Sequence, residues 1–295
     1  MLILNSIQEL QNHLNSIRNQ KKRIGFVPTM GALHAGHISL VDKAKADCDV
    51  AVCSIFVNPT QFNDLSDLDK YPRTLEVDCQ LLEEANCDIV FAPEVKEMYS
   101  DAELELKKQK IEDKSWTNGH LVDFGTLETV MEGAHRPGHF NGVAQVVSKL
   151  FRIVEPNKAY FGQKDFQQLA IIKSMTKQLE MPIEIVACDI MRESNGLAMS
   201  SRNERLTIQE RREAAVISKT LFTLKEQYKS KSIAELKALA EELIKMVPSI
   251  TMEYLEISDS ETLQPISDFK QSKSAVVCIA VKLGDVRLID NVVLY

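Results

Sequence analysis

Two histidines at a three-residue spacing are the residues of this sequence best suited to chemistry. His34 and His37 lie in the stretch Met30–His37, which follows an apolar segment that predicts a strand. If this stretch enters a helix, both imidazoles lie on one face of its first turn. The amide groups of a helix start attract phosphate, and Gly36 lets a ligand approach the backbone closely. The motif therefore predicts a phosphate site; the alternative is a turn with two solvated histidines.

Two side-chain amides form a second candidate group. Asn58 and Gln61 follow the apolar run that ends at Val57. Because amides both donate and accept hydrogen bonds, they suit a small polar substrate with hydroxyl and carboxylate groups. An Asn-Pro pair such as Asn58-Pro59 is also an ordinary turn, so the motif is weak by itself.

Two further motifs add cationic side chains. Gly162–Asp165 follows a predicted strand and contains Lys164, which is suited to neutralise a phosphate, and Gln168 lies one helical turn further on. Met199–Arg202 places two hydroxyls before a guanidinium, which binds phosphate oxygens as a fork. The alternative for both motifs is a capped helix with an exposed basic side chain.

Another histidine pair lies in a glycine-containing stretch. His135 and His139 have a four-residue spacing, but Pro137 and Gly138 lie between them and break a helix. The spacing therefore does not place both imidazoles on one face. We expect an ordered loop near the pocket and no protein-bound metal.

Alternating strand and helix patterns predict the elements that position these motifs. An α/β fold with a Rossmann-like, doubly wound parallel sheet is expected for residues 1–189. In such sheets ligands bind at the carboxyl ends of the strands, where the motifs lie. The expected strands are 23–27, 49–57, 88–92, 159–161 and 183–190, and the expected helices are 36–46, 74–86, 143–154 and 165–179. The polar stretch Ser100–Gly125 is an excursion without assigned structure.

The pattern changes after about residue 190, where a smaller α+β domain is expected at 190–295. Two helices open at Thr207 and Ser232, each followed three residues later by a glutamate, as in a capping box. Strand patterns follow at 252–258, 274–283 and 286–293.

Composition excludes several classes of protein. The chain has 295 residues, with 42 acidic and 35 basic side chains and a net charge of -7, which argues against a nucleic-acid partner. No apolar run approaches the roughly 20 residues of a membrane-spanning helix, and the first residues do not resemble a signal peptide. Six scattered cysteines without a C-x-x-C pair indicate reduced thiols in a cytoplasmic protein.

In this order, the motifs resemble the pantoate–β-alanine ligase family, a member of the H-x-G-H nucleotidyltransferase group. The resemblance extends over nearly the whole chain. It implies that ATP and pantoate form an acyl-adenylate, which β-alanine then converts to pantothenate with release of AMP. It also implies Mg²⁺ held mainly through the phosphates, a place in coenzyme A biosynthesis, and a cytoplasmic homodimer.

The resemblance also implies roles for residues. His37, His34, Lys164 and Arg202 would be catalytic, while Asn58, Gln61 and Gln168 would hold the substrate. Residues expected to line the ATP site are Met30, Gly31, Ala32, Leu33, His34, Ala35, Gly36, His37, Gly162, Gln163, Lys164, Asp165, Met191, Met199, Ser200, Ser201 and Arg202. Two positions depart from the family pattern, because Gln145 stands where relatives usually have Thr and Met191 where Val is common.

Two alternatives remain open at this point. One is another nucleotidyltransferase of the same group that acts on a phosphorylated substrate, which would require basic residues in place of Asn58, Gln61 and Gln168. The other is a nucleotide-binding sensor without turnover.

Overall fold

The computed structural model describes residues 1–62, 65–105 and 122–295, and the chain divides into two compact units. The first unit comprises Met1–Phe124, Arg136–Gly162 and Ile171–Cys188. The second comprises Gly125–His135, Gln163–Ala170 and Asp189–Tyr295. The domain division into 1–189 and 190–295 stays a prediction; the second unit additionally takes in two earlier segments. Most of the predicted excursion lies outside the described residues.

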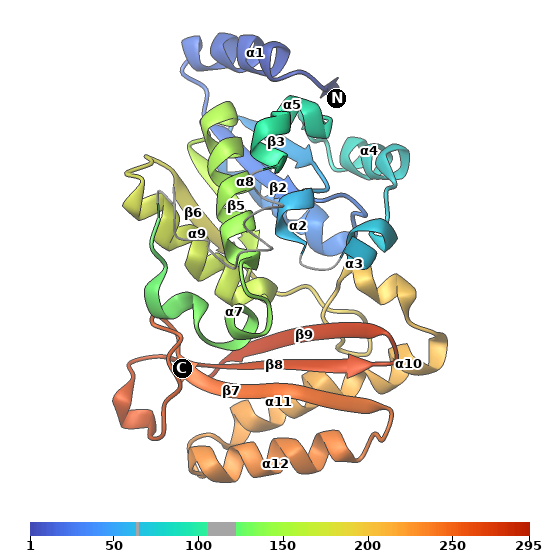
Figure 1. Ribbon diagram of the computed structural model, residues 1–295, viewed down its shortest axis with the longest axis vertical. Helices are drawn as coiled ribbons and strands as arrows, with labels where there is room; N and C mark the ends of the chain where they lie inside the picture. Colours follow the sequence, from blue (N-terminus) through green and yellow to red (C-terminus); the bar gives the residue numbers. More distant parts are fainter. Residues whose placement is uncertain (63–64, 106–121) are drawn as a thin grey trace. The chain divides into compact units, whose positions relative to one another are not determined.

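The first unit contains a six-stranded parallel sheet with the strand order β1-β4-β3-β2-β5-β6. Strands β2, β3, β5 and β6 are labelled in Figure 1. The strands are β1 Leu2–Leu4, β2 Ile24–Thr29, β3 Val50–Ile55, β4 Ile89–Phe91, β5 Lys158–Gly162 and β6 Glu184–Cys188. From β2 the chain adds β3 and β4 on one side and β5 and β6 on the other. The sheet is therefore doubly wound, as predicted, and its order reverses between β2 and β5.

Consecutive residues of β2, β3 and β4 are buried, so both faces of these strands are covered, which explains why they read as nearly continuous apolar runs. Val27, Ala51 and Val90 share one buried cluster with Val41 and Leu82, which come from covering helices. The helices of this unit are α1 Ile7–Asn19, α2 Ala35–Asp47, α3 Leu65–Lys70, α4 Leu75–Glu84, α5 Val95–Met98 and α8 His139–Val154, and α9 Phe166–Gln178 begins in the second unit. Each predicted helix is present, whereas β1 and α1 were not predicted.

The second unit is built on a three-stranded antiparallel sheet in the order β7-β8-β9. The strands are β7 Ile250–Asp259, β8 Ala275–Leu283 and β9 Val286–Val293, and the helices are α7 Met131–His135, α10 Ile208–Glu213, α11 Ala215–Gln227 and α12 Ile233–Lys245. Both predicted capping boxes are present, at Thr207 and Ser232. The first helical stretch differs from the prediction, because it is divided at Ala214 into α10 and α11.

The two faces of this sheet are covered by different segments. Val277 and Ile279 of β8 and Leu288 of β9 belong to a cluster with α11 and α12 residues. On the other face, Cys278 packs with Met131 of α7 and with the first turns of α9. Alternate residues of each strand therefore serve the two faces, as expected for a strand that is covered on both sides.

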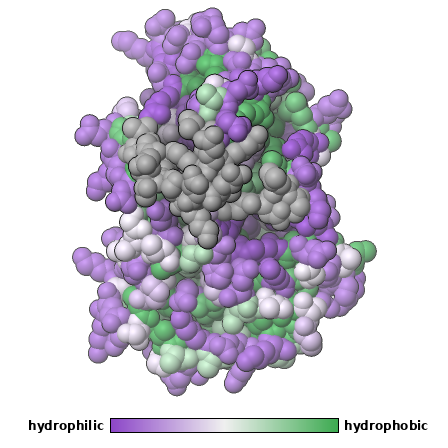
Figure 2. All heavy atoms as spheres, in the orientation of Figure 1, coloured by the Kyte–Doolittle hydropathy of each residue, from purple (hydrophilic) through white to green (hydrophobic). Residues whose placement is uncertain are grey.

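The visible surface in Figure 2 is largely hydrophilic, with smaller apolar patches between the polar side chains. Among the described residues, no helix is long and apolar enough to span a membrane.

Candidate active site

Three of the motifs begin at the carboxyl ends of three neighbouring strands. Asn58 and Gln61 follow β3, Met30–His37 follows β2, and Gln163–Asp165 follows β5. Since β3, β2 and β5 are adjacent and parallel, these strand ends lie next to one another. The strand order reverses between β2 and β5, and such a reversal point is the usual ligand site of a doubly wound sheet.

A buried carboxylate holds the loop that follows β2. Asp78 of α4 accepts hydrogen bonds from the backbone N–H groups of Ala32, at 2.9 Å, and Leu33, at 2.7 Å. Gly31 has a φ of +78°, and a Cβ atom there would lie 3.0 Å from Asp78 Oδ2 and 3.1 Å from Ile55 Cγ2. A glycine is thus required both by the backbone conformation and by the lack of space.

The two histidines of this loop are held as a pair at the start of α2. His34 is the N-cap, and its Nδ1 accepts the N–H of Gly36, while Nδ1 of His37 accepts the N–H of His34. The ring centroids are 4.1 Å apart. Because each Nδ1 is an acceptor, the proton of each neutral ring is assigned to Nε2. The pair can therefore present N–H donors at a helix start, an arrangement suited to phosphate oxygens.

Asn58 is buried, and the hydrogen-bonding groups of its side chain are occupied. Its Nδ2 donates to Gln61 Oε1 and to the carbonyl of Gly142, and its Oδ1 accepts from Thr60 and from the Tyr99 hydroxyl. Only 1% of the residue is exposed. The expected direct contact with substrate would require Asn58 to give up one of these bonds.

Gln61 is oriented by several neighbours. Its side chain accepts from Asn58, its Nε2 lies 2.8 Å from the sulfur of Met30, and its carbonyl lies 2.9 Å from Nδ1 of His139. Helix α8 also approaches closely, because a Cβ on Gly142 would lie 2.4 Å from the Thr60 carbonyl. His135 and His139, which were both predicted in a loop, are instead the last residue of α7 and the buried first residue of α8.

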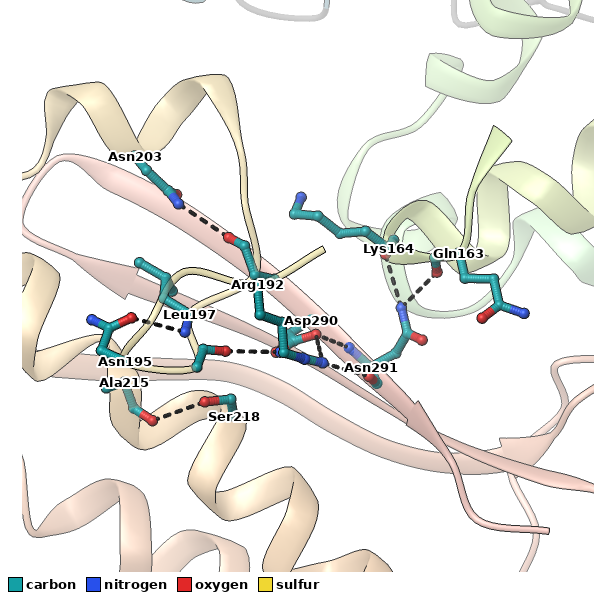
Figure 3. A network of polar contacts seen from close by, with 12 residues as sticks. Gln163, Lys164, Arg192, Asn195, Leu197, Asn203, Ala215, Ser218, Asp290 and Asn291 are labelled. Atoms are coloured by element: carbon teal, nitrogen blue, oxygen red, sulfur yellow. Dashed lines mark hydrogen bonds and ion pairs between the residues drawn. The ribbon is translucent and has the colours of Figure 1, made fainter. Parts of the chain in front are cut away.

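In the second unit, the turn Gln163–Asp165 presents Lys164 at the start of α9. The Asn291 side chain donates to the carbonyls of Gln163 and Lys164, each at 2.9 Å. Figure 3 shows the Lys164 ammonium directed away from Asn291. Among the described residues this ammonium has no hydrogen-bond or ion-pair partner, so its charge is suited to an anionic ligand. Gln168 is half-buried in the first turn of α9.

The segment from Met191 to Arg202 folds back on itself. Met199 donates its N–H to the Met191 carbonyl, and the Ser200 hydroxyl caps the short 3-10 helix Ser201–Arg205 by accepting the N–H of Arg202. Asn203 is buried and donates to the Ala198 carbonyl, which holds the turn in place. The segment therefore presents two serines and a guanidinium on a defined backbone.

Sequence comparisons assign the chain to a protein family. Residues 2–293 match the family described as pantoate-beta-alanine ligase. The chain belongs to this ligase family. Pantothenate synthetase of Phocaeicola vulgatus is 52% identical over 293 residues, 99% of both chains, and that of Bacteroides thetaiotaomicron is 49% identical over 292 residues, 99% of this chain and 98% of the other.

Solved structures of the ligase family have the same fold. A crystal structure of pantothenate synthetase from Thermus thermophilus matches with a TM-score of 0.89 and 40% identity over 100% of both chains. One of pantoate-β-alanine ligase from Francisella tularensis, complexed with β,γ-ATP and β-alanine, matches with a TM-score of 0.76 and 33% identity over 100% of this chain and 98% of the other.

Several residues that hold the ligase motifs were missed by sequence analysis. Asp78 and Asn291 bind backbone groups of the motifs without belonging to any motif, and Asp290 binds Arg192, the residue after Met191. For Asp290 and Asn291 a signal was present, since these two adjacent polar residues lie between apolar residues in strand β9, whose other polar residue is Arg287. Asp78 had none, because an acidic residue in the first turn of a helix is common.

The described part of the chain contains no group of three or more His, Cys, Asp or Glu residues that could hold a metal ion. Mg²⁺ held mainly through the phosphates of a nucleotide stays a prediction, and phosphate oxygens and water can satisfy much of its coordination.

Proposed function

We propose that this chain condenses pantoate with β-alanine in an ATP-dependent reaction that proceeds through pantoyl-adenylate. The main support, beside membership of the ligase family, is that three motifs leave the adjacent ends of β3, β2 and β5. A pantoate carboxylate oxygen would attack the α-phosphorus of ATP, and the bond to the bridging oxygen would break to release pyrophosphate. The β-alanine amine would then attack the acyl carbon, release AMP and lose a proton.

Residues of the first unit would contact both ATP and pantoate. In the first unit, Met30–His37 would bind ATP, with Nε2 of His34 and His37 donating to phosphate oxygens. Gln61 would hold pantoate, and Asn58 would act by fixing the orientation of Gln61. These assignments rest on the hydrogen bonds of the loop and on the burial of Asn58.

We propose that Gly162–Asp165 binds the ribose and α-phosphate; Gly162 is the last residue of β5, and Gln163–Asp165 belongs to the second unit. Lys164 would stabilise the negative charge that develops on the leaving oxygens, and Gln168 would contact pantoate. Met199–Arg202 would bind the β- and γ-phosphates, and the backbone of Met191 would contact adenine. Mg²⁺ bound to the phosphates would supply further charge neutralisation.

The experiment that tests the function is pyrophosphate release from ATP and Mg²⁺ with and without pantoate. We expect release that depends on pantoate, and pantothenate when β-alanine is added. Release from phosphorylated acceptors in place of pantoate would favour the alternative nucleotidyltransferase, and tight ATP binding without turnover would favour a sensor.

Lys164→Ala tests the assigned role of its charge. Losing one oriented donor in comparable sites costs about 10²–10³-fold in kcat, so we expect a loss of that size in adenylate formation with an unchanged melting temperature. Lys173→Ala, an exposed lysine of α9, is the matched control. Near-normal activity of Lys164→Ala would refute the assignment.

The assembly and location are also proposals. We propose a homodimer in the cytoplasm, in keeping with the ligase family and with six free cysteines. Light scattering on the purified protein tests the homodimer, and a mass equal to one chain at micromolar concentration would contradict it. Fractionation of cells tests the location.

A further inference from the structure

Two adjacent residues of β9 contact two segments of the second unit that carry basic side chains. These segments are Gln163–Asp165, which contains Lys164, and Met191–Arg202. Asp290 and Asn291 are 3% and 4% exposed and face opposite sides of the sheet. Asp290 lies on the side of Leu288 and Val292, which pack with α11 and α12, and Asn291 lies on the side of Val293, which packs near α7 and α9. Figure 3 shows the two side chains reaching different segments.

Asn291 fixes the backbone on both sides of the Lys164 Cα atom. The carbonyls of Gln163 and Lys164 belong to the two peptide units that flank this atom, and one carboxamide donates to both. Because each peptide unit is planar, holding both carbonyls restricts φ and ψ of Lys164. The direction of its Cα–Cβ bond, from which the ammonium extends, is restricted as a result.

Asp290 holds the segment that leads to Met199–Arg202. Its carboxylate forms a two-pronged ion pair with Arg192, with N–O distances of 2.6 and 3.0 Å. Arg192 also donates to the Gly196 carbonyl, and its backbone pairs with Ala198 across the turn. The ion pair therefore fastens both the beginning and the tip of the segment to β9.

The two anchors are connected to each other. The N–H of Asn291 donates to Asp290 Oδ1 at 2.8 Å, and Arg192 Nη2 lies 3.5 Å from the Asn291 carbonyl. Burial raises the pKa of the Asp290 carboxyl, while the nearby Arg192 and Lys164 charges oppose the shift. The buried carboxylate is thus bound on several sides. Removing it would leave the hydrogen-bond donors of Arg192 and Asn291 without this acceptor.

We propose that Asp290 and Asn291 are positioning residues of the proposed ligase reaction, on which this inference rests. Asn291 orients Lys164, and Asp290 orients the Met191–Arg202 segment through Arg192. Neither residue belongs to a motif, and neither side chain needs to touch a substrate.

A double-mutant cycle between Asn291→Ala and Lys164→Ala tests the first half, in single-turnover adenylate formation with excess enzyme. Misplacement of a reacting group by about 1 Å costs roughly 10²-fold, so we expect Asn291→Ala to slow the step by about 10- to 100-fold with little change in KM for pantoate. In the Lys164→Ala background the same change should cost less than about 3-fold, since both changes act on one group. Equal losses in both backgrounds would overturn the proposal.

Amide hydrogen exchange of the ligand-free protein provides a readout that does not depend on activity. We expect Asn291→Ala to accelerate exchange at residues 163–168 and Asp290→Asn at residues 192–202. Acceleration across the whole second unit, or at neither segment, would overturn the positioning role. If the wild-type chain released no pyrophosphate, the proposed function would fail while this exchange result still tested the anchors.

Gln264→Ala is the matched control for both measurements. The Gln264 amide also donates to two backbone carbonyls of the second unit, those of Thr126 and Thr262. Its removal should leave adenylate formation and exchange at 163–168 unchanged. A loss as large as that of Asn291→Ala would show that any amide anchor in this unit has the same effect, which contradicts the proposal.

Discussion

Asp78→Asn is expected to destabilise the first unit and to weaken ATP binding together. Asp78 is 1% exposed, and its two carboxylate oxygens accept from different backbone groups, Oδ2 from Ala32 and Oδ1 from Leu33. Asparagine has the same shape but only one acceptor oxygen. Whichever way its amide is turned, the NH₂ group faces one of the two backbone N–H groups.

The size of the effect follows from these contacts. A hydrogen bond to a charged group contributes about 1.5–3 kcal/mol, and an unsatisfied buried donor costs about 1–3 kcal/mol. Because one bond is lost and the other becomes neutral, we expect the free energy of unfolding to fall by about 2–4 kcal/mol. The KM for ATP should rise as well, since the loosened loop carries His34 and its helix start.

Urea unfolding followed by circular dichroism measures the first effect, and initial rates of pyrophosphate release measure the second. Asp42→Asn is the control, because Asp42 is an exposed residue of α2 and the change should alter stability by less than about 0.5 kcal/mol. If Asp78→Asn unfolded at the same urea concentration as Asp42→Asn, the view that the carboxylate clamps this loop would be refuted.

Two further changes give distinct outcomes. A Cβ at Gly162 would meet no described atom within 4 Å, so Gly162→Ala should keep the melting temperature. If the nucleotide lies against this backbone, the added methyl group should lower the affinity for ATP. An unchanged affinity in a binding titration would contradict that placement. Burial raises the pKa of the Cys87 thiol to about 11, so the thiol loses its proton at a lower pH in the unfolded chain than in the folded chain. Stability should therefore fall as the pH rises from about 9 to about 11, and Cys87→Ala should flatten this slope in urea titrations; identical slopes would rule the thiol out.

Periodicity and turn residues were enough to predict most of the fold. The runs that became β2, β3 and β4 are apolar because their consecutive residues are buried on both faces, and α8 shows the three- and four-residue spacing of a helix. The two capping boxes were confirmed because they depend only on residues three positions apart. By contrast, β1 has three residues and lies at the sheet edge, too short for a pattern to be recognised.

The motifs of the site were predicted with their strands, but the contacts of some side chains were not. Asn58 carries the groups of a ligand-binding residue, and only folding shows that Thr60, Tyr99 and Gly142 occupy them. His139 was separated from Gln61 by 78 residues, and no local pattern links the two. A side chain's donors and acceptors are visible in the sequence, while the partners that satisfy them depend on packing.

The sequence by itself determined the order of histidines, amides, lysine and arginine from which a chemistry is proposed, and it predicted the strands that precede most of them. Tertiary structure decided which residues hold those groups in place. Asp78 and Asn291 act on segments 45 or more residues away, Asp78 on Leu33 and Asn291 on Lys164, and such contacts form only when the two sheets bring distant segments together. A short stretch of sequence indicates the backbone conformation that its residues prefer. A long-range hydrogen bond depends instead on the position of both partners in the folded chain.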